Sequence, residues 1–320
     1  MHISNEINYW LKPTISRPCP LCGGQAHLLL SNQMQFYLNS TTVICKCCGF
    51  VFTNPMPLQE TYDQFYIEAY GKYYEYTVRR LSRGFGDKEP RRVKQRLDWL
   101  ETIHSLAGMR LLEVGPGQGY FLWWAQARGA AVKGVEPSPT LSEDLMNSGL
   151  PCVCSSFERM QFSSGAFDII LMLHVLEHFY DPNLALAKCK MILSDNGLLV
   201  IEVPNILKPF RSLDRYFLRY VHPSNFSPQT LQAMLQKHGF SVRFIDEGKN
   251  DWRSHQSLFI IAGRTDKLNQ PLLPPRQSAD DVLQILNNYR RRWLFYLGVA
   301  WHAHRLYLWG RSLAYRALHA

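Results

Sequence analysis

Two carboxylates and a glycine-rich turn form the part of this sequence best suited to binding a small ligand. An apolar run that ends at Glu113 and Val114 has the composition of a buried strand, and glycines follow at positions 115, 117 and 119. Glycines let the backbone approach a ligand closely. A second apolar run ends at Glu136, about 20 residues later, where nucleotide-binding folds place a carboxylate that accepts hydrogen bonds from a ribose. The two strand ends therefore predict a site for a ribose-containing cofactor.

The glycine spacing discriminates between cofactors. A dinucleotide fingerprint needs a third glycine where helix and strand pack closely, but that position is Tyr120 counted from Gly115 and Leu122 counted from Gly117. The string Glu113-Val-Gly-Pro-Gly-Gln-Gly119 instead resembles the first motif of class I S-adenosylmethionine (SAM)-dependent methyltransferases. The resemblance implies that Glu113 helps to hold the methionine amino group and that Glu136 accepts from the ribose hydroxyls. For the glycines alone, an ordinary left-handed turn is the alternative.

The same resemblance assigns further residues to the SAM site. Ser156 and Phe157 occupy the positions at which the family's third loop meets the adenine, although aspartate is more usual than serine there. Together, the residues that the resemblance implies for SAM binding are Glu113, Gly115, Gly117, Gly119, Glu136, Pro137, Ser156, Phe157 and Leu173.

A histidine-rich string follows the apolar segment 167–173. His174-Val-Leu-Glu-His178 matches an inverzincin metalloprotease pattern, but that chemistry needs one helix to present both histidines, whereas His174 is expected at a strand end. Methyltransferases of the family carry a V-L-E-H string followed by Asp-Pro, here Asp181-Pro182, which implies that His174 lies at the pocket mouth. Because histidine titrates near neutral pH, His174 and His222 are the candidate bases for a hydroxyl acceptor. A structural role for each histidine is the alternative.

Two cysteine turns near the start of the chain have the spacing of a metal site. Cys19-Pro-Leu-Cys22 and Cys45-Lys-Cys-Cys48 are each followed by a glycine, and the segment between them has the composition of a strand pair with a large or bulged hairpin. Four thiolates on such turns suit tetrahedral zinc. Cys48 rather than Cys47 repeats the spacing of the first pair, so we predict structural zinc bound by Cys19, Cys22, Cys45 and Cys48. A redox pair, or a ribbon that has lost its metal, is the alternative.

Alternating helical and strand-like segments must position these residues. The alternation begins near residue 93 and indicates a doubly wound parallel sheet. With the resemblance, the expected fold is α/β: a Rossmann-like seven-stranded class I methyltransferase sheet with a small N-terminal zinc ribbon and a C-terminal helical extension. The predicted division is a ribbon at 1–56, a helical lid at 57–92, the methyltransferase domain at 93–265, and a linker with basic amphipathic helices at 266–320.

Candidate contacts with the methyl acceptor come from segments flanking the sheet. Methyltransferases of this type close their cofactor site with N-terminal helices, which implies Tyr73 and Tyr74 as lid residues. Cations at 208, 211, 215 and 219 are expected on one face of a helix. Among them, Arg211 and Arg215 are candidates for binding a phosphate-bearing acceptor, with a solvated cationic face as the alternative. The basic segment 79–96 is predicted to be a solvated loop and helix start, with a binding patch as the alternative.

Composition and charge limit the partners. The chain has 320 residues, 46% of them hydrophobic, and no apolar run of the length needed to span a membrane. We therefore expect a cytoplasmic protein, in which eight cysteines indicate metal ligands or free thiols. A formal charge of +9 favours an anionic partner. Residues 279–320 carry no acid after Asp281 and are expected to form one or two helices that lie at a membrane surface, pack as a hairpin or form a homodimer interface.

These observations predict a SAM-dependent methyltransferase that acts on a hydroxyl or carbon of a small molecule. The resemblance is closest to methyltransferases with a cysteine zinc ribbon in sugar, surface-polysaccharide or natural-product pathways. It implies a sugar or related acceptor, a phosphate-bearing molecule or a glycan. The alternatives are an RNA methyltransferase that grips the phosphate backbone, disfavoured because the sequence shows no aromatic and basic nucleic-acid motif, and a non-catalytic SAM-binding adaptor.

Overall fold

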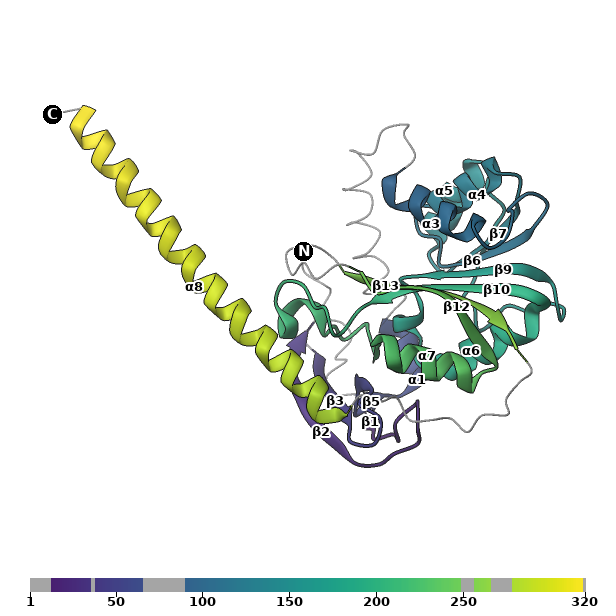
Figure 1. Cartoon of the computed structure of the whole chain (residues 1–320), viewed down its shortest axis with the longest axis horizontal. Helices are drawn as coiled ribbons and strands as arrows, with labels where there is room; N and C mark the ends of the chain where they lie inside the picture. The colour runs from purple at the N-terminus through teal and green to yellow at the C-terminus, as the bar shows by residue number, and fades with distance from the viewer. Residues whose placement is uncertain (1–12, 36–37, 66–89, 249–255, 266–277, 319–320) are drawn as a thin grey trace.

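A seven-stranded sheet forms the centre of the molecule (Figure 1). The computed structural model describes residues 13–35, 38–65, 90–248, 256–265 and 278–318. The strand order is β12-β13-β10-β9-β6-β7-β8, and β13 runs antiparallel to both of its neighbours. The strands are β6 (Arg110–Val114), β7 (Ala131–Glu136), β8 (Cys152–Cys154), β9 (Phe167–Leu173), β10 (Leu193–Pro204), β12 (Phe240–Asp246) and β13 (Ser257–Arg264). This arrangement confirms the expected class I methyltransferase fold.

Helices cover both faces of the sheet and bury its alternating apolar side chains. Helices α3 (Arg91–Glu101), α4 (Tyr120–Ala127) and α5 (Pro139–Asn147) pack on one face, and α6 (Pro182–Ile192) and α7 (Pro228–Lys237) pack on the other. Helices α5, α6 and α7 each begin with proline after a capping residue whose side chain accepts a backbone hydrogen bond. These N-caps are Ser138, Asp181 and Ser227, so local sequence defines where three helices start.

The cysteine turns belong to a smaller sheet that is joined to the seven-stranded body. Its order is β11-β4-β3-β2, and β2 and β3 pair with a register shift between Leu29 and Ser31, the bulge expected from the long hairpin. Strand β11 comes from a much later part of the chain and pairs with β4, so the ribbon sheet contains a strand of the body. The strands of this sheet are β2 (His27–Gln35), β3 (Leu38–Cys45), β4 (Val51–Thr53) and β11 (Ser224–Asn225). A separate short pair, β1 (Thr14–Ile15) and β5 (Met56–Pro57), and helix α1 (Gln59–Phe65) complete the N-terminal elements.

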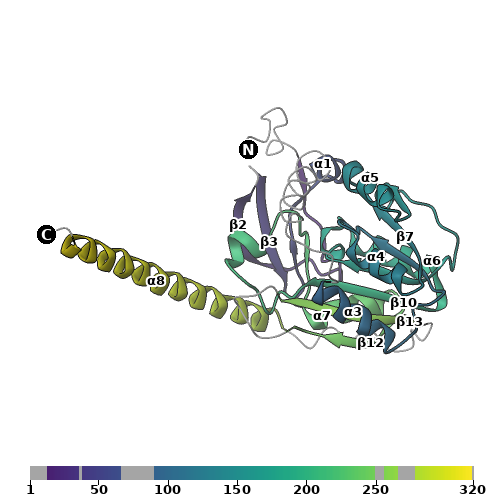
Figure 2. The same ribbon diagram turned by 90° about the horizontal axis from the view of Figure 1, so that it is seen from above.

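The C-terminal extension is one continuous helix, α8 (Ala279–Leu318), of 40 residues. The hairpin alternative is wrong because no turn interrupts these residues. Figures 1 and 2 show the helix leaving the body at its first turns and extending away from it. No helix among the described residues is long and apolar enough to cross a membrane.

The expected cationic helix after the fifth strand is also wrong. Arg211 has a φ of 57°, in the left-handed region, and only the five-residue π-helix η4 (Leu213–Phe217) follows it. The left-handed residue, together with Pro209 two residues before it, interrupts the helical spacing on which the prediction depended. The Arg211 and Arg219 guanidinium groups instead lie over the ring of Tyr216, at 4.5 and 5.7 Å from its centroid.

Candidate functional site

The glycine turn lies at the carboxyl end of β6, where the order of the sheet reverses between β6 and β9. In open α/β sheets this is the place at which ligands bind. Gly115, Gly117 and Gly119 have φ values of 64°, 55° and 73°, which L side chains rarely adopt. A Cβ at Gly115 would meet a Val175 methyl at 2.8 Å, and one at Gly119 would meet Leu145 Cδ2 at 2.2 Å. The backbone conformation therefore favours glycine at these two positions, and any larger residue would also force the Val175 or Leu145 side chain to move.

The two carboxylates predicted for SAM binding flank this turn. Glu136 ends β7, and its side chain accepts hydrogen bonds from the backbone N–H groups of Gly117 and Ser138, each at 3.0 Å. Glu113 is buried in β6, and its Oε2 atom has no hydrogen-bond partner among the described residues. Burial, with the negative charge of Glu136 adding to it, raises the pKa of Glu113 to about 8. An unsatisfied buried carboxylate oxygen fits the ammonium group of SAM, so these residues can hold the cofactor.

The raised pKa of Glu113 makes cofactor affinity depend on pH. Below its pKa the free carboxyl is neutral, whereas a bound ammonium stabilises its ionised form and lowers that pKa. Affinity for S-adenosylhomocysteine should therefore rise between about pH 6 and pH 8, by at most about tenfold per pH unit for one linked proton. Calorimetric titrations across this range measure the slope. Glu113→Gln should bind more weakly at pH 8 with a flat profile, and an equally steep profile in the variant would contradict the assignment.

The remaining residues implied for the cofactor lie at the same edge of the sheet. Pro137 follows Glu136, Leu173 ends β9, and both are partly exposed. Phe157 is different because its ring is buried in the core, edge-on to Phe179 at 6.1 Å between centroids. Ser156 is partly exposed, whereas the Phe157 carbonyl accepts a hydrogen bond from Lys188 at 2.6 Å.

His174 connects the end of β9 to β10 and β13. It is a non-glycine residue with a φ of 58°, and its N–H donates to the Glu202 carbonyl at 2.7 Å. Its Nε2 atom lies 3.4 Å from Glu202 Oε1 and 3.3 Å from Ser257 Oγ, and its Nδ1 atom lies 3.5 Å from Glu177 Oε1. Burial lowers the pKa of His174, but the two glutamates outweigh it and raise the pKa to about 9. A histidine held protonated at neutral pH argues against the predicted role of His174 as a base.

Glu202 organises this cluster, and sequence reasoning missed it because it lies within an apolar strand. Arg96 of α3 donates to both carboxylate oxygens, at 3.0 and 3.2 Å, and Arg92 donates to the same carboxylate. Although burial raises the pKa of Glu202, His174 and the arginines hold it well below its usual range. The prediction of a solvated helix start is therefore wrong for Arg96, which is buried.

The free energy of unfolding should depend on pH through the charge of His174. Its pKa is 6.5 unfolded and about 9 folded, so its stabilisation is complete below pH 6.5 and is lost as the pH rises through 9. His174→Asn, which suits the left-handed backbone, should therefore lose less stability than the wild type across this range. Urea midpoints at several pH values measure the difference. Glu202, whose lowered pKa acts at acidic pH, does not affect this window, so parallel curves would show that His174 is not held protonated.

A second pair of histidines lies beside this cluster. The His178 and His222 rings meet edge to face, with 4.6 Å between centroids. Glu177, His178 and His222 offer ligand atoms that lie within 4.8 Å of one another. The buried Glu177 carboxylate has its ion-pair contact with His174, but within the part of the chain that the structure describes neither of its oxygens accepts a regular hydrogen bond. One carboxylate and two imidazoles form a set able to bind a divalent metal. Burial and the positive charge of Arg219 contribute to a lowered pKa of His178, which keeps this ring neutral.

The ribbon side of the molecule positions the second histidine pair. The Tyr62 hydroxyl in α1 lies 2.9 Å from the His178 carbonyl and 3.3 Å from that of Val221, the residue before His222. Tyr62 is buried, so this hydroxyl joins the two backbone segments that carry the histidines. His178 stands in the H-x-x-E-H string, the signal that would have identified it from sequence.

The four predicted zinc ligands meet at one point. The Cys19 and Cys48 Sγ atoms are 3.6 Å apart, those of Cys22 and Cys45 are 3.5 Å apart, and all four lie within 4.8 Å of one another. Zinc–sulfur bonds of about 2.3 Å at tetrahedral angles place sulfurs roughly 3.8 Å apart, so the cluster fits zinc.

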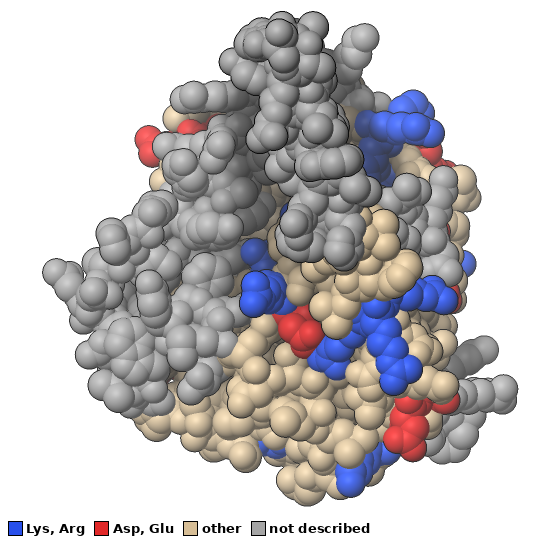
Figure 3. Space-filling model, turned by 90° about the vertical axis from the view of Figure 1, so that its left-hand side faces the viewer, with Lys and Arg blue, Asp and Glu red and all other residues tan. Residues whose placement is uncertain are grey.

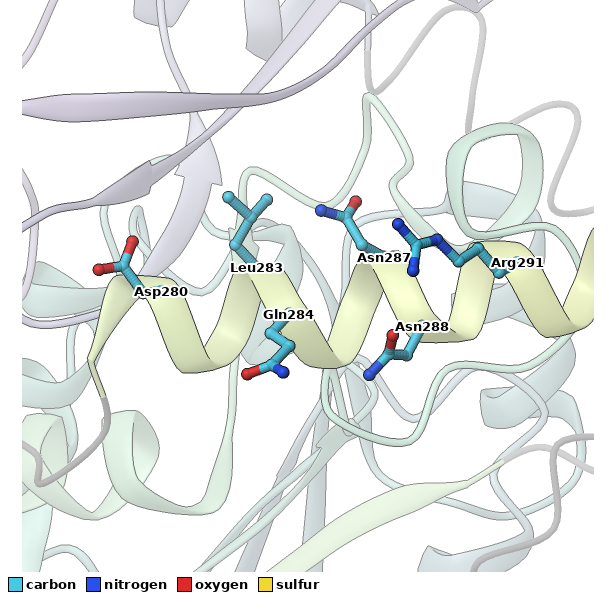
Figure 4. Close-up of a pocket in the computed structure, with 6 residues that line it drawn as sticks. All are labelled: Asp280, Leu283, Gln284, Asn287, Asn288 and Arg291. Carbon is cyan, nitrogen blue, oxygen red and sulfur yellow. The ribbon is translucent and has the colours of Figure 1, made fainter.

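The predicted acceptor residues do not form one group. Tyr73 and Tyr74 lie outside the described residues. Arg215 lies in η4 and Arg211 lies just before it. This short helix packs against β2 and α8. A shallow hollow, apart from the glycine turn and the histidines, is lined by residues of α8 alone (Figure 4): Asp280, Leu283, Gln284, Asn287, Asn288 and Arg291.

Comparison with known proteins agrees with the fold and the glycine turn. A family model described as a methyltransferase domain matches residues 85–243. The ubiquinone biosynthesis O-methyltransferase of Bradyrhizobium diazoefficiens is 30% identical over 112 residues, which cover 33% of this chain and 44% of that enzyme. A tRNA U34 carboxymethyltransferase of Aeromonas hydrophila is 28% identical over 196 residues, covering 51% of this chain and 58% of that protein. The matched region thus spans about half the length of these relatives.

A solved structure shows the same fold. The 1,6-didemethyltoxoflavin-N1-methyltransferase of Burkholderia thailandensis superposes with a TM-score of 0.51 at 16% identity, covering 68% of this chain and 96% of that one. At this identity the likeness concerns the fold alone.

Proposed function

With a class I methyltransferase domain as the premise, we propose that this protein transfers a methyl group from SAM to a hydroxyl of a small molecule. The observation that carries the proposal is the buried Glu113 carboxylate, whose Oε2 atom accepts no hydrogen bond from the described residues. It lies beside a turn of glycines with positive φ, at the carboxyl end of the strands where His174 follows β9. Bound SAM supplies an electrophilic methyl group. The protein must orient the acceptor, exclude water and remove one proton.

In this proposal His222 takes the proton of the acceptor hydroxyl. The edge-to-face contact with His178 and the Tyr62 hydroxyl hold the position of His222. His174 has a different role, because its protonated ring gives the pocket mouth positive charge together with Arg92. Arg92, Arg96 and His174 are three cations around Glu177 and Glu202, so their charge favours an acceptor with an anionic group.

The acceptor classes to test come from two sources. The sequence resemblance indicates a saccharide or a related secondary metabolite, with carbon as the alternative target atom. The partial match to ubiquinone biosynthesis O-methyltransferases adds phenolic hydroxyls. Anionic members of both classes, such as nucleotide sugars and hydroxybenzoates, are the first to assay.

Calorimetric titration of zinc-replete protein with S-adenosylhomocysteine, beside NAD, tests the cofactor assignment. We expect micromolar binding of S-adenosylhomocysteine only, and its loss in Gly119→Val, whose side chain would collide with Leu145. Gly149→Val is the matched control, since Gly149 also has a positive φ but has open space around its Cβ position. Absence of S-adenosylhomocysteine binding by the folded wild type would reject the proposed function.

RNA methylation is the second candidate. The tRNA-modifying relative and the formal charge of +9 favour it. Binding to tRNA that weakens steeply with salt, together with methyl transfer to tRNA, would identify this activity. Methylation of a small acceptor in the absence of RNA would instead support the first proposal.

A further inference from the structure

Helix α8 contains an uncharged apolar segment between arginines. Residues 293–304 read Trp-Leu-Phe-Tyr-Leu-Gly-Val-Ala-Trp-His-Ala-His and contain no charged residue other than titratable histidine, with Arg292 before them and Arg305 after them. Leu294 is 67% exposed and Phe295 75% exposed, and residues up to Val299 are also exposed. Consecutive helical residues point in different directions around the axis. The described part of this segment is therefore apolar on several faces at once, and residues 294–299 expose these faces to solvent.

The start of α8 is fixed to the body, so this exposure is built into the fold. Val282 and Leu286 are fully buried beside Leu30 and η4. Arg290 forms an ion pair with Asp214 at 2.6 Å and donates to the Leu30 carbonyl at 2.8 Å. Beyond its first turns, α8 extends away from the sheets in both ribbon views (Figures 1 and 2).

We propose that residues 293–304 insert into one leaflet of an anionic membrane. Exposed apolar surface on several faces needs an apolar medium around the helix, which a bilayer provides. Twelve helical residues span about 18 Å, whereas a hydrocarbon core is about 30 Å thick. The segment is thus too short to cross and suits an interfacial position, with its tryptophans and tyrosine at the headgroup level.

Charge favours a lipid surface over a second copy of the chain. Arginines stand at positions 290, 291, 292, 305, 311 and 316, and no acid follows Asp281. Two such helices side by side would bring like charges together, whereas anionic headgroups would neutralise them. The described charged side chains on the side of the molecule toward which α8 extends are mostly Lys and Arg (Figure 3).

Vesicle sedimentation of the full chain tests this proposal. We expect the protein to pellet with vesicles of equimolar phosphatidylcholine and phosphatidylglycerol, and to bind phosphatidylcholine alone much more weakly. The double variant Leu294→Glu with Phe295→Glu should lose binding at least tenfold. Leu184→Glu, at a position in α6 that is also 67% exposed, should leave binding unchanged. Arg291→Gln and Arg292→Gln should each weaken binding to the anionic vesicles about fivefold.

The same samples separate the competing outcomes. Wild-type protein that stays in the supernatant with both kinds of vesicle would overturn the proposal. A wild-type dimer in lipid-free solution that the Leu294→Glu and Phe295→Glu variant converts to monomer, without vesicle binding, would assign the helix to self-association. Because both residues are exposed, the variant should retain S-adenosylhomocysteine affinity and thermal stability, so lost binding would not reflect misfolding.

Discussion

Replacing Cys19 with serine should destabilise the seven-stranded body together with the ribbon. Cys19, Cys45 and Cys48 are buried in the same apolar cluster as side chains of β6, β9, β10, α6 and α7. Strand β11 pairs with β4, and the Pro20 carbonyl accepts hydrogen bonds from Asn183 and Lys237. Loss of a structural metal can lower the free energy of unfolding by more than about 4 kcal/mol. For a domain of 150–250 residues, this corresponds to a fall of roughly 8–16 °C in Tm.

Thermal unfolding followed by circular dichroism and by zinc release measures this effect. Cys47→Ser is the matched control, because Cys47 lies on the same turn but is exposed and outside the four-sulfur cluster. Its Tm should stay near that of the wild type. A Cys19→Ser protein with the wild-type Tm and a full complement of zinc would show that this thiol is not a ligand. Two separate transitions would show that ribbon and body unfold independently.

His222→Gln should lower kcat by about 10²–10⁴, the usual contribution of a general base, and leave S-adenosylhomocysteine affinity unchanged. The structural reason is that His222 contacts the His178 ring, whereas the residues predicted for the cofactor come from other strand ends. Initial rates with a saturating acceptor, together with calorimetric titration of the cofactor product, measure the two quantities. Glutamine retains polar atoms at this buried site but cannot take a proton at neutral pH.

His104→Gln, in an exposed loop, is the control for substituting a histidine and should leave kcat unchanged. His174→Asn is informative because we expect a higher KM for anionic acceptors rather than a complete loss of turnover. If His174→Asn abolished turnover while His222→Gln did not, the base would be His174. If His222→Gln also lost cofactor binding or folding, its role would be structural.

Features that depend on local pattern were predictable from the amino-acid sequence. The apolar strand, the glycine spacing and the second carboxylate predicted the β6–α4 and β7 units, because a turn of alternate glycines in left-handed conformation is encoded within a few residues. Ser138 and Ser227 before prolines marked the starts of α5 and α7 for the same reason. The two cysteine pairs predicted which four sulfurs meet, since four thiolates have few geometries in which to share a metal.

The charge of His174 and the contacts between distant segments at the site depend on the tertiary structure. Glu202 lies far along the chain from Arg92, Arg96 and Glu177, yet together they surround His174 and reverse its expected charge, because a pKa depends on burial and on neighbours from every packed element. The pairing of His178 with His222 needed the Tyr62 hydroxyl to join two distant segments. The helical spacing of Arg211 and Arg215 failed because one left-handed residue interrupts it. Residues 294–299 of α8 are exposed because, among the side chains that the structure describes, those that α8 buries against the body belong to its first turns.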